Sequence, residues 1–149
     1  MVLGWHLTYS LHATSTEVNL ENRMKFLCIA YEEEPKLNGL SRSEWQVLRQ
    51  RTLDYVENLQ NQGRLIITHA LQSATTASTV RIRNGELSIT DGPFAETKEQ
   101  LGGFFVIEAS GPQEAIEIAA GWPSAAIGSI EVRPIEEELR MDGRYGELA

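Results

Sequence analysis

Cysteine is the first shortage that limits what this chain can be. Cys28 is the only thiol among 149 residues, which excludes an internal disulfide and a CxxC metal site. It lies in the apolar run at 26–30, where no neighbour obviously lowers a thiol pKa, so we interpret it as a buried and inert side chain. Because disulfides persist in oxidising compartments, their exclusion favours a reducing one, and we expect a cytoplasmic protein.

Clusters of basic residues are absent as well. Lys and Arg number 13 against 21 Asp and Glu, which gives a net charge of −8. Phosphate backbones and anionic membrane surfaces both bind grouped cations, so we expect neither a nucleic-acid nor a membrane partner. No apolar run approaches the length of a membrane span. No His or Cys pair has ligand spacing, and no nucleotide loop or GxSxG elbow occurs, so we expect no metal and no cofactor.

The remaining composition is that of one soluble globular domain. Apolar residues make up 42% and charged residues 23% of the chain, both ordinary values. We interpret residues 24–135 as the domain, residues 1–23 as an N-terminal extension and residues 136–149 as an acidic tail. The alternative for the extension is docking on the domain through Trp5, Leu7 and Leu11.

Hydrophobic periodicity predicts alternating strands and helices. Strands are predicted at 25–31, 65–71, 103–109 and 129–135, and residues 32–39 are predicted to be a solvated loop. Ser41 with Glu44 forms a capping box that begins one helix, which Gly63 ends, and Pro112 begins a second helix that ends near Gly121. The predicted buried stripes are Trp45, Leu48, Thr52, Tyr55, Val56 and Leu59 on the first helix, and Ala115, Ile116, Ala119 and Ala120 on the second.

An Asn84-Gly85 pair marks a β-hairpin between the two halves of this pattern. It is the preferred two-residue type I′ turn, and it places Val80, Ile82, Leu87 and Ile89 on one face. The following stretch, 90–103, starts with an Asp-Gly-Pro turn. Helix-forming residues from Ala95 to Leu101 predict one or two helical turns, which Gly102-Gly103 would end.

This order of elements predicts an α+β fold, a ferredoxin-like β-α-β-β-α-β sandwich with an inserted β-hairpin. The strands at 25–31 and 103–109 are apolar on both faces, as central strands are. Two helices cover only one face, so Leu27, Ile29 and part of 104–107 would stay exposed. We therefore predict a homodimer that packs sheet to sheet, with the hairpin folded over that face as the alternative.

Several stretches together resemble the DGPF branch of the YCII-related family. The longest is 90–104, which contains Asp91-Gly92-Pro93-Phe94, and the others are 24–27, 70–72, 79–81 and 128–134. The resemblance implies a dimeric α+β barrel in a cytoplasmic bacterial protein. Members of the family often lie near genes for extracytoplasmic-function sigma factors, and related YCII proteins carry a proposed His-Asp site. Many DGPF proteins have Glu where this chain has His69, so a site at that position works differently here.

Asp91 and His69 are the candidate catalytic residues. Asp91 enters the motif loop from a strand end, where it serves as a general base if burial raises its pKa, or simply closes the turn. His69 is the only histidine of the predicted domain. It relays a proton to Asp91 or is an ordinary half-exposed strand residue. Convergence of the two side chains in a pocket would favour an enzyme.

Four further residues are candidates for substrate binding. Arg81 and Lys98 are cations that can hold an anionic group, although Lys98 also suits a solvated surface. Glu96 is a polar side chain of the motif loop, and Tyr31 brings a hydroxyl to the end of a central strand. We expect a cofactor-independent enzyme that does acid–base chemistry on a small molecule. The alternative is a non-catalytic ligand-binding or regulatory module associated with an extracytoplasmic-function sigma factor.

Overall fold

Two long antiparallel strands form the centre of the molecule. The computed structural model describes residues 22–137, so nearly all of the predicted extension and most of the acidic tail lie outside the described residues. β1 (Met24–Glu32) pairs with β5 (Gln100–Ala109), and β2 (Leu65–Ala70) and β6 (Ser129–Pro134) flank them in the order β2-β5-β1-β6. The α+β, ferredoxin-like prediction and its two central strands are confirmed. No closed barrel forms within the described part of the chain.

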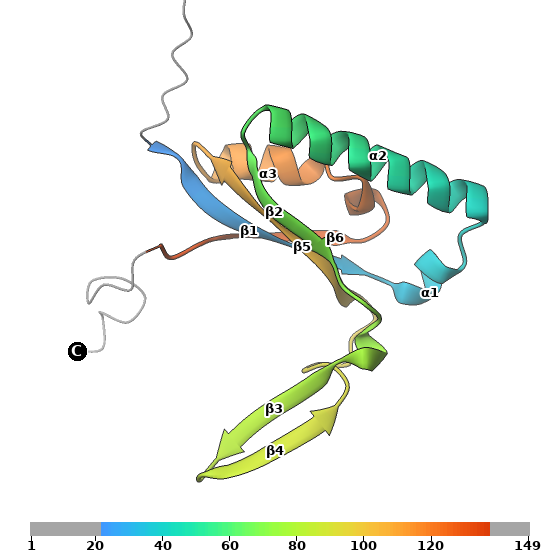
Figure 1. Ribbon diagram of the computed structural model, residues 1–149, viewed down its shortest axis with the longest axis vertical. Helices are drawn as coiled ribbons and strands as arrows, with labels where there is room; N and C mark the ends of the chain where they lie inside the picture. Colours follow the sequence, from blue (N-terminus) through green and yellow to red (C-terminus); the bar gives the residue numbers. More distant parts are fainter. Residues whose placement is uncertain (1–21, 138–149) are drawn as a thin grey trace, which may run out of the picture.

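Both long helices lie on the same face of this sheet (Figure 1). α2 (Arg42–Asn61) begins with the predicted capping box, in which Ser41 N–H donates to Glu44 Oε2 at 2.8 Å and Glu44 N–H donates to Ser41 Oγ at 3.3 Å. α3 (Pro112–Ala120) begins at its proline, as predicted. The predicted loop after β1 is wrong in one part, because α1 (Glu34–Asn38) is a short helix with a proline in its first turn.

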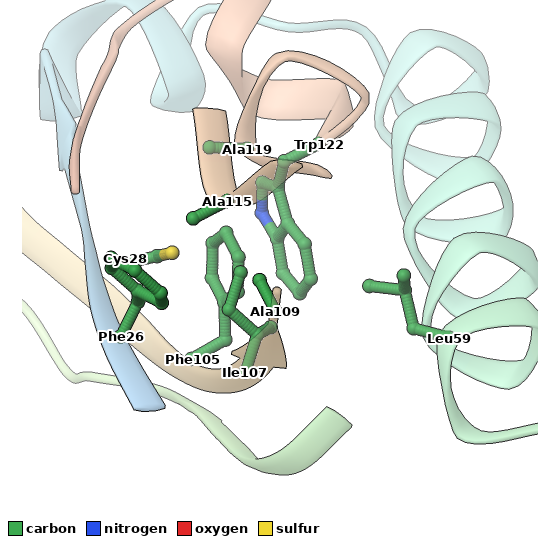
Figure 2. Close-up of a cluster of buried hydrophobic side chains, with 9 residues drawn as sticks. All are labelled: Phe26, Cys28, Leu59, Phe105, Ile107, Ala109, Ala115, Ala119 and Trp122. Carbon is green, nitrogen blue, oxygen red and sulfur yellow. The ribbon is translucent and has the colours of Figure 1, made fainter. Parts of the chain in front are cut away.

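The core is a layer of side chains between the sheet and the helices. Phe26 and Cys28 of β1 and Phe105 and Ile107 of β5 are fully buried. Figure 2 shows Trp122 beside Phe105, and the two rings stack with centroids 3.9 Å apart and an interplanar angle of 9°. Burial raises the pKa of the Cys28 thiol to about 12, so its predicted inertness has a physical basis.

The buried stripe of α3 differs from the predicted one. Ala115 and Ala119 are buried as expected, but Ile116 is 52% exposed and Ala120 is also exposed. Ile118 packs on the core in their place. Together with Trp122, which follows the helix, these residues stand at positions i, i+3, i+4 and i+7, and this set forms one apolar face.

α2 contacts the core through its C-terminal half. Leu59 is buried, and Tyr55 and Val56 pack against the cluster. Trp45, predicted to be buried, is 48% exposed. The N-terminal half of α2 therefore does not close onto the sheet.

The hairpin has the predicted register. β3 (Ser78–Arg83) pairs with β4 (Glu86–Asp91), with Val80 opposite Ile89 and Ile82 opposite Leu87. Asn84 and Gly85 have φ of 52° and 79°, as a type I′ turn requires. Figure 1 shows the hairpin projecting from the end of the sheet, on the side away from the helices. It does not lie over the open face, contrary to the alternative considered above.

The predicted helical turns at Ala95–Leu101 are wrong. The described chain is irregular from 92 to 99, and β5 begins at Gln100 and runs on through both glycines. Gly103 pairs with Ala30 on one side and Ala70 on the other. Gln100 and Leu101 pair with β1, and this pairing outweighs the helix propensity of the stretch, which is worth only about 0.2–0.7 kcal/mol per residue.

The stacked pair at the centre of the core gives the first test. We expect Phe105→Ala to lower the free energy of unfolding by about 3–5 kcal/mol, because it removes a fully buried ring and its contact with Trp122. Ile116→Ala, on the exposed side of α3, should cost less than about 1 kcal/mol. Urea unfolding followed by circular dichroism measures both. Equal losses in the two variants would contradict this description of the core.

Candidate functional site

A cavity of about 400 Å³ lies between the N-terminal half of α2 and the sheet. This size is within the usual range of small-molecule pockets, about 300–1,000 Å³. Most of its wall is apolar. The helix side is formed by Trp45, Leu48, Leu53 and Val56, and the sheet and the segment after α3 contribute Ala30, Ala70, Gly103, Phe105 and Trp122. The cavity exists because Trp122 fills only the half of the helix–sheet layer nearest α3.

Glu32 places a carboxylate in this apolar wall. It is the last residue of β1 and shares the helix-facing side of that strand with Phe26, Cys28 and Ala30, which are all buried. Burial raises the pKa of the Glu32 carboxyl, because removal from water disfavours the ionised form.

Gly102 makes room for this carboxylate. The β1–β5 register shifts between Ala30 and Tyr31, and Gly102 is the residue of β5 left without a partner in β1. A Cβ atom at Gly102 would lie only 2.5 Å from Glu32 Oε2. The absence of a side chain at the bulge therefore lets the carboxylate lie against the backbone.

Ser124 adds a hydroxyl to the wall, whose other polar side chains besides Glu32 are Arg49, Thr52, Thr68 and His69. It belongs to the short 3₁₀ helix η3 (Pro123–Ala126), is only 6% exposed and lines the cavity. The Ser124 hydroxyl lies close enough to the Glu32 carboxylate to oppose the rise in its pKa by weak hydrogen bonding, but the geometry falls short of a full hydrogen bond. Within residues 22–137, the Ser124 Oγ is a buried polar atom that lacks a partner. Such atoms are rare, and a ligand is one way to satisfy them.

Comparison with known proteins assigns this chain to a family. The YCII-related domain matches residues 24–139. The chain belongs to the YCII-related family. A curated protein of Rhizobium meliloti (strain 1021), described as uncharacterized, is 33% identical over 114 residues, which cover 75% of this chain and 92% of that protein. The resemblance noted from the sequence is thus confirmed, and family membership by itself names no reaction.

Asp91 and His69 lie in different sheets. Asp91 ends β4, is exposed, and pairs through its backbone with Ser78. His69 lies in β2 opposite Phe104, at a register position on the face away from the helices, and the rings of the two residues are 5.9 Å apart. Both residues also contribute to the lining of the cavity, whereas Asp91 does not. Among the described residues, no hydrogen bond or ion pair joins the His69 and Asp91 side chains. Their catalytic roles stay a prediction.

The predicted binding residues are dispersed. The Arg81 guanidinium lies over the ring of Phe94, 5.7 Å from its centroid. Lys98 Nζ lies 3.6 Å from Glu33 Oε1 and remains largely exposed. Glu96 is exposed in the loop before β5, and Tyr31 lies on the open face of β1 between Leu101 and Ser129. None of these four residues lines the cavity, and their predicted role as one substrate site stays untested.

The sequence carried only a weak signal for Glu32 and Ser124. Glu32 begins a run of three glutamates that suggests a solvated loop. The signal that could have found it is the alternation that continues from Phe26 through Ala30. Ser124 follows a Trp-Pro pair, and nothing in the local pattern marks its hydroxyl as buried.

Two other features are absent from the described part of the chain. No group of three or more His, Cys, Asp or Glu residues is placed to hold a metal ion between residues 22 and 137. Over the same range, no helix combines the length and the apolar character needed to cross a membrane.

The raised pKa of Glu32 gives a prediction with a definite sign. A carboxyl whose folded-state pKa is raised favours folding at low pH, and this contribution is lost as pH rises from about 4.5 through the folded-state value. Glu32→Gln should therefore match the wild type at low pH and become the more stable protein towards neutral pH. Urea unfolding at a series of pH values measures the difference.

Glu34→Gln is the matched comparison, with the opposite sign. Glu34 Oε1 accepts a hydrogen bond from Ala74 N–H at 2.6 Å, which lowers the pKa of that carboxyl. This variant should be less stable than the wild type at neutral pH and converge with it as the medium becomes acidic. If both variants shift in the same direction, the assignment of Glu32 as a desolvated carboxyl is wrong.

Proposed function

We propose that the protein binds a small, mostly apolar carbonyl compound in the cavity under α2 and transfers a proton on it through Glu32. The observation that carries this proposal is the pairing of a desolvated carboxyl with a partnerless hydroxyl in one apolar cavity. Pockets of this composition, with a few convergent polar groups and a shifted pKa, are typical of small-molecule sites.

Glu32 and Ser124 each have a distinct chemical role in this proposal. The Ser124 hydroxyl donates a hydrogen bond to the carbonyl oxygen and stabilises the negative charge that grows there. The Glu32 carboxylate removes a proton from the carbon next to the carbonyl and returns it to another carbon of the same molecule, as an isomerase does. A raised pKa suits this task, because a stronger base takes a carbon-bound proton more readily at neutral pH.

Binding without turnover is the second candidate function. Among residues 22–137, Glu32 is the only carboxylate that lines the cavity, and the imidazole of His69, which also lines it, belongs to a strand position that faces away from the helices. A binding or regulatory module needs the cavity alone. An association with an extracytoplasmic-function sigma factor and a cytoplasmic location remain predictions from the sequence.

We also propose that the protein is a homodimer that packs through the open face of the sheet. That face carries Leu27 and Ile29 of β1, Ile67 of β2, and Phe104 and Val106 of β5, by the register of the strands. The helices lie on the other face, and the hairpin projects away (Figure 1). A second copy would bury this apolar surface and would complete a barrel that one chain does not close.

Proton exchange tests the catalytic proposal directly. Cyclohexanone and phenylacetone are suitable probes, because both are apolar ketones small enough for the cavity. In deuterium oxide, the wild type should speed exchange at the carbon next to the carbonyl, and Glu32→Gln should lose about 100-fold or more of this rate. Asp91→Asn tests the rival assignment made from the sequence, and this proposal expects that variant to keep the full rate.

Amide chemical shifts, measured by NMR as either ketone is added, separate catalysis from binding without turnover. Shifts at Leu48, Val56 and Thr68 without any exchange would contradict catalysis and favour the binding module. If Asp91→Asn loses the proton exchange and Glu32→Gln keeps it, the proposed site under α2 is wrong. The site is also wrong if a ketone binds without changing the shifts of these three amides.

A further inference from the structure

We propose that the β3–β4 hairpin is an arm that packs its apolar face against a second copy of this chain. We call residues 78–91 the arm. This inference rests on the proposed homodimer, and it adds a second contact surface that lies outside the open face of the sheet. Nothing in the arm belongs to the cavity under α2.

One face of the arm is both apolar and uncovered. Val80, Ile82, Leu87 and Ile89 share this face by the pairing register, and each side chain is 61–64% exposed. The opposite face is polar, with Arg81 paired to Ser88. An isolated two-stranded hairpin is at best marginally stable in water, so a surface of this kind is normally packed against something.

The base of the arm is held firmly. Thr79 Oγ1 donates to the Gly92 carbonyl at 2.9 Å, and Gly92 N–H donates to the Ala77 carbonyl at 2.7 Å. The turn before β3 is fixed from another element, because Glu34 of α1 accepts hydrogen bonds from Ser73 Oγ and Ala74 N–H at 2.8 and 2.6 Å. These contacts set the direction of the arm before any partner arrives, which lowers the entropy lost on association.

Position favours a second copy as the partner. The arm extends on the side of the sheet that the helices leave uncovered (Figure 1). A copy that packs on the open face is therefore brought beside the arm, and by two-fold symmetry the partner's arm is brought beside the first chain.

Charge favours the same partner. The chain has a net charge of −8, which opposes self-association in general. The arm, however, is balanced, with Arg81 and Arg83 against Glu86 and Asp91. The rim of the open face is balanced as well, with Lys25, Glu108, Glu131 and Arg133 on its strands. The two apolar surfaces are thus places where two copies approach without net repulsion.

The area is sufficient for a stable contact. Four aliphatic side chains exposed to this degree offer about 300 Å² of apolar surface. Two symmetric arms and the surfaces they cover would remove about 1,200 Å² from water, which reaches the lower end of stable interfaces. The open faces of the two sheets add to this area.

Sedimentation equilibrium of the full chain tests the arm. The double variant Ile82→Lys with Leu87→Lys places two charges on the apolar face and should weaken the dimer at least about tenfold. The control, Ser88→Lys with Thr90→Lys, adds the same charge to the polar face of the same arm and should leave the dissociation constant within about twofold of the wild type.

A labelling experiment keeps the test decisive if the double variant folds poorly. Leu87→Cys and Ser88→Cys each carry an environment-sensitive dye on one face of the arm, and the buried Cys28 does not compete for the label. Emission from position 87 should shift to the blue as protein concentration rises through the dimerisation range. Emission from the dye at position 88 should stay unchanged over the same concentration range.

Each outcome decides between the two proposals. A dimer that tolerates the double variant, or equal dye responses at both positions, overturns the arm and leaves the homodimer standing. A wild-type chain that sediments as one 16.6 kDa species up to high micromolar concentration overturns both. A dimer weakened only by the substitutions on the apolar face supports the arm.

Discussion

Two helices suffice to cover only one face of the four-stranded sheet, and both of them lie on the same one (Figure 1). This constraint shapes everything else in the molecule. On the covered face, the layer between helix and sheet is filled by Phe105 and Trp122 near α3 and remains open under the N-terminal half of α2. On the other face, apolar side chains of the central strands have no cover from the described chain. The cavity and the open face are thus two results of one arrangement.

The cavity gains its chemical character from a local irregularity. A bulge at Gly102 lets the Glu32 carboxylate lie against β5 while β1 keeps its alternation. Desolvation then raises the pKa of the carboxyl, and Ser124 adds a hydroxyl without a partner among the described residues. A structural carboxylate would normally be hydrogen-bonded or paired, as Glu34 and Glu114 are. The difference between these carboxylates is what points to function at Glu32.

The sequence predicted those parts of the fold that depend on short-range chemistry. Asn84-Gly85 determined the hairpin register, Ser41 with Glu44 determined the start of α2, and apolar character on both faces identified the central strands. The features that the sequence did not predict correctly depend on tertiary contacts. The stretch 95–101 has helix-forming residues yet is irregular up to residue 99 and then enters β5, and α3 turns Ile118 inward because Trp122 continues its stripe.

Much less of the site could be predicted. The long motif drew attention to Asp91 and to the loop that follows it, but a motif shows which residues recur in a family and not which cavity they line. Glu32 looked like one charge in an acidic run, and only the buried positions of its own strand distinguish it. The burial of the Glu32 carboxylate depends on the bulge at Gly102 and on how much of the layer between helices and sheet Trp122 fills. Neither can be read from the residues next to Glu32 in the sequence.

The central claim is that the fold holds a desolvated carboxyl at Glu32, and its own titration tests this most directly. Carboxyl carbon NMR of the assigned Glu32 resonance gives the pKa of this one group in the intact protein. We predict a midpoint above the ordinary value of 4.5, because burial disfavours the charged form. A midpoint at or below 4.5 would contradict the claim and would make Glu32 an ordinary surface residue.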